Sequence, residues 1–251
     1  MPPAPPSPPL SYTTAPAVLP YTLRFHPHRP SSSSSHHTHR LCVGAAVVLT
    51  SAPTTPATAT ATATATPRIL LLRRSAREKA MPLRWELPGG GADAPDGDAL
   101  AAAARELWEE AGLRAVRFVA LVGCYQWEGA AGPGIDAAAV PGDQGWGLAN
   151  GGVGIVAAKG ADAAAAAAAV TNAAAGARDA WRKYTYLVEI EAPTDGAAVE
   201  VVIDPEEHDA FVWATEDEVR AGRCGHVVLE WTSETQKLDV LRALKICKDE
   251  A

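Results

Sequence analysis

A glycine-rich turn, followed closely by a helix with three clustered glutamates, constrains this 251-residue chain more than any other feature. The turn ends at Gly91, and apolar periodicity predicts a helix over residues 98–111. Glu106, Glu109 and Glu110 stand at positions i, i+3 and i+4, so a helix places their carboxylates on one face. The opposite face is apolar and is expected to pack inward; it consists of Leu100, Ala104, Leu107 and Ala111. The acidic face is therefore expected to point toward solvent or a cleft.

Three neighbouring carboxylates repel one another unless a cation neutralises them. Oxygen ligands of this kind favour Mg²⁺ or Mn²⁺ over zinc. Glutamate runs on helices are more often solvated faces without function, and the three residues alone favour that alternative. The residues around them decide between the two interpretations.

The segment around these glutamates resembles the Nudix box, G-x5-E-x7-R-E-U-x-E-E-x-G-U, where U is an aliphatic residue. The lead-in from Trp85 to Gly91, which reads W-E-L-P-G-G-G, is also similar to that of the family. Gly91 occupies the first glycine of the box, and the later positions match in order at Arg105, Glu106, Leu107, Glu109, Glu110, Gly112 and Leu113. We therefore suspect that the chain belongs to the Nudix hydrolase family.

This resemblance implies an α/β layered fold, with a mixed β-sheet and helices on its faces. It also implies a pyrophosphatase, a hydrolase that acts on phosphoanhydride bonds. Catalytic roles are implied for Glu106, Glu109 and Glu110, with Arg105 as a structural partner. The same glutamates, with a backbone carbonyl of the turn at Gly91, are the implied ligands of Mg²⁺ or Mn²⁺.

Glu206 and Glu207 are weaker candidates, because they lie in a loop where many family members place another acidic ligand or base. Exposed loop glutamates without function are the alternative, and His208 is more often structural than a general base. The expected reaction is cleavage of the pyrophosphate bond of a nucleoside diphosphate linked to another moiety. The substrate is thus a small-molecule nucleotide whose identity the sequence leaves open.

One box position departs from the pattern, because Gly97 stands where the family has glutamate. In the family that glutamate braces the loop and helix by pairing with the box arginine. Asp96 or Asp98 is expected to replace it, and Asp98 also suits the N-cap of the helix. The departure keeps open an alternative of another class, a catalytically impaired Nudix-fold module that binds nucleotides. Retention of the three helix glutamates favours the enzyme.

Composition divides the chain into a tail and one domain. Residues 1–40 are rich in proline, serine and histidine and are predicted to form a disordered tail. Residues 41–248 are predicted to form the Nudix hydrolase domain, with an Ala/Thr loop at 57–66 and a Gly/Ala-rich insertion at 129–180 between paired strands.

Strands are expected at residues 41–50, 68–74, 85–87, 116–127, 181–191, 199–203 and 210–213. Thr215 and Glu218 have capping-box spacing for a short helix. A closing helix is expected over residues 233–248, with Leu238, Leu241 and Ile246 inward.

The charge is distributed unevenly along the chain. Seven of the 22 basic residues and none of the 29 acidic residues precede Glu78, so the remainder has 15 basic and 29 acidic residues and a net charge of −14. Such a body repels polyphosphate backbones, which argues against nucleic-acid polymers as partners and against an RNA-end-processing enzyme. An anionic nucleotide would need a bridging cation.

The four cysteines are scattered without C-x-x-C spacing, which favours a reducing compartment over a disulfide framework. No apolar run is long enough to span a membrane, so no membrane association is expected. A cytoplasmic location is favoured, with mitochondrial import as the weaker alternative because prolines interrupt the acid-free N-terminal segment. The oligomeric state stays open.

Several residues outside the box are candidates for substrate contact. Arg73, Arg74, Arg182 and Lys183 suit phosphate, and Tyr125, Trp127 and Trp146 suit base stacking. Solvated charges and aromatic residues of a sheet core are the favoured alternatives.

Overall fold

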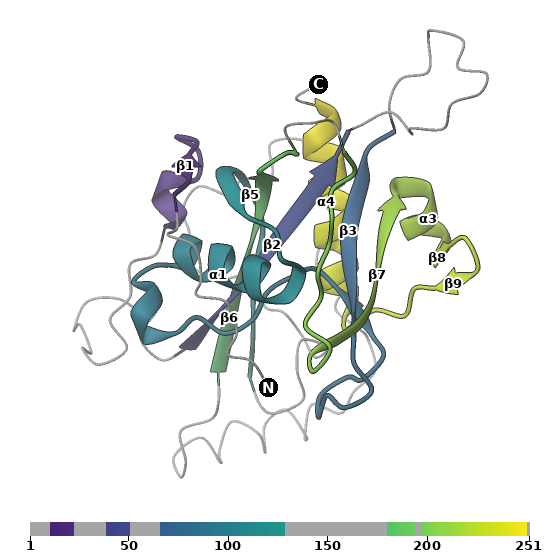
Figure 1. Ribbon diagram of the computed structural model, residues 1–251. Helices are drawn as coiled ribbons and strands as arrows, with labels where there is room; N and C mark the ends of the chain where they lie inside the picture. The colour runs from purple at the N-terminus through teal and green to yellow at the C-terminus, as the bar shows by residue number, and fades with distance from the viewer. Residues whose placement is uncertain (1–10, 23–38, 51–65, 129–179, 194–196, 250–251) are drawn as a thin grey trace, which may run out of the picture.

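A computed structural model describes residues 11–22, 39–50, 66–128, 180–193 and 197–249. They form a mixed β-sheet with helices packed against it (Figure 1), which confirms the predicted α/β layered class. The elements in chain order are β1 (Thr13–Thr14), η1 (Leu19–Tyr21), β2 (His39–Leu49), β3 (Arg68–Arg74), β4 (Trp85–Glu86), η3 (Ala94–Asp96), α1 (Ala99–Ala111), β5 (Ala115–Glu128), β6 (Ala180–Ile190), β7 (His208–Thr215), α3 (Glu216–Ala221), β8 (Arg223–Cys224), β9 (Val227–Val228) and α4 (Glu234–Asp249).

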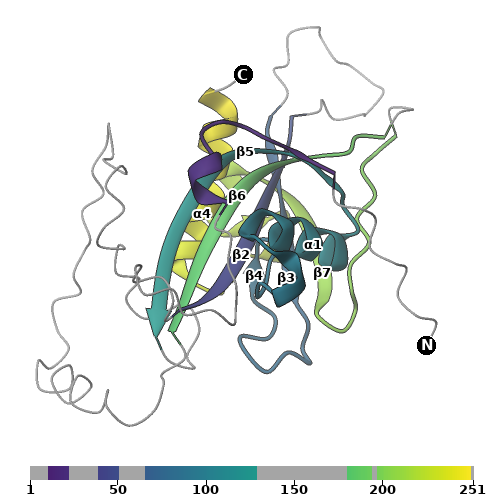
Figure 2. The same ribbon diagram turned by 90° about the vertical axis from the view of Figure 1, so that its left-hand side faces the viewer.

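The large sheet has the order β1-β5-β6-β2-β3-β4, and β7 pairs with β3. The pairs β1–β5 and β2–β6 are parallel, whereas β5–β6, β2–β3, β3–β4 and β3–β7 are antiparallel. β5 and β6 run side by side (Figure 2) to the register pair Glu128 and Ala180, so the chain between them is inserted between paired strands. The insertion itself, and the Ala/Thr loop except for its last residue, lie outside the described residues.

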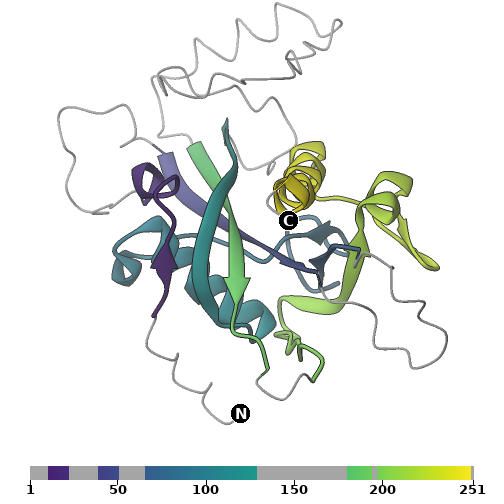
Figure 3. The same cartoon turned by 90° about the horizontal axis from the view of Figure 1, so that it is seen from above.

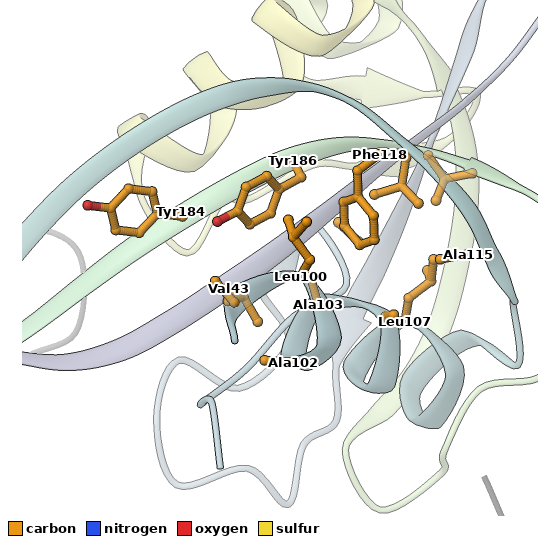
Figure 4. Close-up of a cluster of buried hydrophobic side chains, with 14 of the residues drawn as sticks. Val43, Leu100, Ala102, Ala103, Leu107, Ala115, Phe118, Tyr184 and Tyr186 are labelled. Carbon is orange, nitrogen blue, oxygen red and sulfur yellow. The ribbon is translucent and has the colours of Figure 1, made fainter. Parts of the chain in front are cut away.

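Alternation along the strands gives the sheet two apolar faces. On one face, Val43 of β2 and Tyr184 and Tyr186 of β6 pack with α1 (Figure 4). On the other face, Ala46 and Leu187 pack with α4, and Figure 3 shows the two helices on opposite sides of the sheet. The inward stripe predicted for α1 is confirmed, because each of its four residues is at most 2% exposed.

The predicted disordered tail is wrong for residues 11–22. Tyr12 stacks edge-on against Phe118 with ring centroids 4.9 Å apart, and Val18 is fully buried. The Tyr186 hydroxyl donates to the carbonyl of Tyr21 at 2.7 Å. A few apolar residues among the prolines thus anchor this segment to the core, a contribution that average composition hides. The rest of the predicted tail up to residue 38 lies outside the described residues.

The predicted strand at residues 199–203 is absent from the structure of that segment. Val199, Val201 and Ile203 pack against the α1 core, and the Val202 amide donates to the Ala111 carbonyl at 2.9 Å. The alternation of apolar residues is therefore satisfied by packing against the end of α1, without a strand ladder.

The closing helix has a different inward face from the predicted one. Leu238 is 44% exposed, Leu241 and Ile246 are partly buried, and the buried positions are Gln236, Asp239, Val240, Ala243 and Leu244. Two polar residues belong to this face because partners on the sheet bind them: the Lys183 ammonium donates to Gln236 Oε1 at 3.3 Å, and the Thr185 hydroxyl donates to Asp239 Oδ2 at 2.8 Å.

In the described part of the chain, no helix is long and apolar enough to cross a bilayer.

This orientation of α4 predicts opposite outcomes for two leucines of one helix. Leu244→Ala is expected to lower the free energy of unfolding by about 2–5 kcal/mol, because it leaves a cavity in a packed core. Leu238→Ala is the matched control and should change it by only about 0.5 kcal/mol. Urea titration followed by circular dichroism measures both, and equal losses would contradict the orientation.

Candidate active site

The glycine turn between β4 and α1 is held against strand β2. The amide of Val43 donates to the Gly90 carbonyl at 2.9 Å, and that of Ala45 to the Pro88 carbonyl at 2.8 Å. Gly89 has φ +149°, and a Cβ there would lie 2.2 Å from the Val43 carbonyl oxygen. A Cβ on Gly90 would lie 2.7 Å from a carboxylate oxygen of Glu106. The two glycines therefore let backbone and carboxylate approach closely.

Glu106 and Glu110 of α1 are buried beside this turn, with 8% and 4% of their surface exposed. The Gly89 amide donates to Glu110 Oε2 at 2.6 Å. Burial raises the pKa of Glu110 well above its usual value, and repulsion from Glu86 and Glu106 adds to the rise. Burial likewise raises the pKa of Glu106 to about 7, against the opposing effect of Arg105. Without a cation, the two carboxylates are therefore poorly stabilised as anions.

Arg105 binds the outer side of this acidic face. Its guanidinium contacts Asp96 at 2.8 and 3.1 Å, Glu109 at 2.7 Å and Glu106 at 3.0 Å. It also donates to the Gly91 carbonyl at 2.9 Å. Its pKa is raised, because these carboxylates outweigh the effect of burial. Glu109, which was expected to bind the metal, is thus exposed and paired with Arg105. The Gly91 carbonyl, the other expected ligand, accepts a hydrogen bond from the same guanidinium.

Asp96 takes the place of the glutamate that the box lacks. Its side chain is 4% exposed and makes two contacts with Arg105. Asp96 is one of the two residues that the sequence offered as a replacement. Asp98 instead caps α1 by accepting from the Ala101 amide at 2.8 Å. Gly97 has φ +78°, a conformation that disfavours side chains, so the bracing carboxylate comes from the preceding residue.

The loop before β7 brings one of the two downstream candidates to the site. Ligand atoms of Glu110, Glu207 and His208 all lie within 4.8 Å of one another. Glu206 points elsewhere, because it is exposed and pairs with Arg77 at 2.6 Å. Glu207 and His208 thus join the α1 glutamates, whereas Glu206 does not.

A cleft of about 260 Å³ opens between these elements. Its lining is dominated by carboxylates and glycine backbone and consists of Arg74, Glu78, Gly89, Gly90, Gly91, Glu106, Glu110 and Glu207. Negative charge therefore predominates in the cleft, which disfavours entry of a phosphate without a counter-charge.

Glu86, which the sequence interpretation did not select, lies buried next to the cleft. Arg74 bridges it to Glu78, with a 2.7 Å contact to Glu86 Oε1. Burial opposes ionisation of Glu86, but His208, Arg74 and Lys183 outweigh it and lower its pKa. The charge of Arg74 is therefore matched by Glu78 and Glu86. The available sequence signal was a lone carboxylate within the apolar W-E-L-P lead-in.

The remaining substrate-contact candidates lie away from the cleft lining. Lys183 is buried at α4, and Tyr125 donates to the same Gln236 oxygen at 3.3 Å. Arg182 points to the opposite face and contacts the Tyr184 hydroxyl at 3.3 Å. Arg73 pairs with Asp209 at 2.7 Å. Trp146 lies outside the described residues, as does the side chain of Trp127.

Comparison with known proteins identifies the domain. Residues 53–137 match the sequence profile of the NUDIX domain. Solved structures similar to this chain include the MutT protein from Methanosarcina mazei, at 15% identity over 84% of this chain and 95% of that one, with a TM-score of 0.42. A Caenorhabditis elegans Ap4A hydrolase matches at 13% identity over 84% and 99%, with a TM-score of 0.41. The Shewanella oneidensis NrtR Nudix domain complexed with ADP ribose matches at 13% identity over 84% of this chain and 88% of that one, with a TM-score of 0.42. The search of curated proteins found no match.

The profile match coincides with the segment that holds the glycine turn, α1 and β5, and it confirms the Nudix resemblance. Residues 53–137 therefore carry a NUDIX domain, which is the domain of the Nudix-type pyrophosphatases that hydrolyse phosphoanhydride bonds.

The role of Asp96 can be tested against a second carboxylate that faces the same arginine. Asp96→Ala should lower the free energy of unfolding by about 2 kcal/mol or more, because Arg105 loses a buried partner. Asp93→Ala removes a carboxylate that is 75% exposed and 3.8 Å from Arg105, and should lower it by at most about 1 kcal/mol.

Chemical denaturation of both variants at equal ionic strength measures the difference. A smaller loss for Asp96→Ala than for Asp93→Ala would show that Asp96 does not replace the missing glutamate.

Proposed function

We propose that the chain is a divalent-cation-dependent hydrolase that cleaves the pyrophosphate bond of a nucleoside diphosphate linked to another moiety. The observation that carries this proposal is the pair of buried carboxylates, Glu106 and Glu110, facing an acidic cleft beside a glycine turn. Burying such groups is costly unless a cation completes the site.

The residues present fit Mg²⁺ or Mn²⁺. Carboxylate and carbonyl oxygens are the ligands that these hard ions prefer. The two guanidiniums beside the cleft are engaged, Arg74 with Glu78 and Glu86, and Arg105 with Asp96 and Glu109. Arg105 also contacts Glu106 at 3.0 Å, but its charge is shared among several carboxylates. The inner carboxylates of Glu106, Glu110 and Glu207 are the groups that we assign to the cation.

Each residue of the cleft has a distinct part in the proposed reaction. The Gly89 amide fixes one oxygen of Glu110, and Arg105 holds Glu106 against the turn. When bound, the divalent cation offsets phosphate charge and activates water. Glu207 is exposed and lines the cleft, so one of its carboxylate oxygens can bind the cation while the other accepts the proton from the attacking water.

The bond balance of the reaction is simple. The water oxygen forms a new bond to one phosphorus, and the bond from that phosphorus to the bridging oxygen breaks. The bridging oxygen leaves with the other phosphate, so two phosphorylated products form without a covalent enzyme intermediate.

A substrate panel tests the proposal with nucleotide sugars, dinucleoside polyphosphates, oxidised nucleotides and NAD-like compounds, each with Mg²⁺ or Mn²⁺. We expect cation-dependent turnover of at least one compound. Glu106→Gln and Glu110→Gln should each lower kcat/KM by about 100-fold or more, which corresponds to about 2.7 kcal/mol of lost transition-state stabilisation. Glu206→Gln is the matched control and should keep the native value, because Glu206 pairs with Arg77 at the surface.

Turnover without added cation, or native turnover in both box variants, would contradict the proposal. Nucleotide binding without turnover of any compound would favour the catalytically impaired binding module.

A further inference from the structure

His208 has an unusual environment for a buried histidine. It is 1% exposed, and among the described residues neither ring nitrogen has a hydrogen-bond partner closer than the 3.5 Å contact of Nε2 with Glu86 Oε1. A buried polar group without a partner is costly and needs an explanation. One ring nitrogen lies within 4.8 Å of carboxylate oxygens of Glu110 and Glu207. The ring therefore faces the proposed cation site with free coordinating capacity.

A β-bulge in strand β7 sets the position of the His208 ring. In the pairing of β3 with β7, Arg73 is opposite Ala210 and Arg74 is opposite His208, so Asp209 is an extra residue at a bulge. A bulge redirects the side chains on either side of it. Asp209 points outward to pair with Arg73, and His208 is buried toward Glu110.

An ion pair with Glu86 does not fully account for His208. The Nε2 atom lies 3.5 Å from Glu86 Oε1, which is long for a hydrogen bond, and that same oxygen already accepts from Arg74 at 2.7 Å. Such a contact would in any case leave the other ring nitrogen without a partner. A carboxylate near one nitrogen is also the usual arrangement around an imidazole that binds metal through the other.

We propose that His208 is a nitrogen ligand of the divalent cation, together with carboxylate oxygens of Glu110 and Glu207. This inference rests on the proposed function, because it concerns the same cation site. Imidazole nitrogen suits transition-metal ions, whereas Mg²⁺ prefers oxygen ligands. The site therefore selects Mn²⁺ over Mg²⁺, and removal of the imidazole weakens Mn²⁺ binding more than Mg²⁺ binding.

Electron spin-echo spectroscopy of Mn²⁺ added to the chelator-stripped full chain tests this ligand directly. We expect ¹⁴N modulation from a bound ring nitrogen, and its replacement by ¹⁵N modulation when the protein is labelled with ¹⁵N-histidine. His208→Gln should remove the modulation and weaken Mn²⁺ binding about 10-fold or more, with less than about a threefold change for Mg²⁺. If His208→Gln fails to fold, the labelled native chain still shows whether a histidine binds Mn²⁺, and variants of the other histidines then show whether that histidine is His208.

Two control variants exclude other histidines. His226→Gln alters an exposed residue in the turn between β8 and β9 and should keep the modulation. A variant with glutamine at His26, His28, His36, His37 and His39 should also keep it. Loss of the modulation in either control would assign the nitrogen to a histidine altered in that control and overturn the inference.

The outcomes also separate this inference from the proposed function. The His208 assignment would be overturned if the native chain turns over substrate but binds Mn²⁺ through oxygen atoms alone, with that binding lost in Glu110→Gln. The proposed hydrolase function would then be unaffected. Nitrogen-coordinated Mn²⁺ without turnover of any substrate would support the ligand and contradict the hydrolase. Absence of Mn²⁺ binding to the native chain would overturn the ligand, and the substrate panel would then judge the function separately.

Discussion

The buried carboxylates of Glu106 and Glu110 lie against a turn of backbone without side chains, and much of the surrounding structure follows from that contact. Glycine is required at Gly89 because a Cβ would collide with the backbone of β2, and a Cβ at Gly90 would displace the carboxylate of Glu106. The turn keeps its shape because its carbonyls continue the hydrogen bonding of β2. The apolar stripe of α1 then fixes the rotation of the helix about its axis. Packing of this stripe into the core therefore also orients the acidic face toward the cleft.

The charges around this contact are arranged unequally. Asp96, Glu109, Glu78 and Glu86 are matched by Arg105 or Arg74, whereas the inner groups Glu110 and Glu207 face each other across the cleft. An acidic body with engaged arginines would repel a pyrophosphate substrate. A divalent cation satisfies both the protein and the substrate, which is why the proposed chemistry depends on it. Asp96 also removes the main reason to regard the box as broken, since Arg105 keeps a buried partner.

Local sequence patterns predicted the parts of the structure that depend on local rules. The helix with its Asp98 cap, the capping box at Thr215 and the strand at residues 68–74 all follow from periodicity and short-range hydrogen bonding. The failures required tertiary information. The rotation of α4 depends on sheet partners for Gln236 and Asp239, and residues 199–203 pack on α1 without pairing as a strand. The approach of Glu207 and His208 to Glu110 depends on the β3–β7 register and its bulge, which no motif encodes.

Thermal unfolding of the chelator-treated chain at increasing Mg²⁺ or Mn²⁺ concentration tests the central claim that a cation completes this cluster of carboxylates. Binding to the folded state alone should raise Tm with the logarithm of cation concentration, by roughly 5–10 °C at about 100 times Kd. Potassium chloride at matched ionic strength should produce no such rise. A Tm that is insensitive to both divalent cations, or that shifts equally with potassium, would contradict the claim.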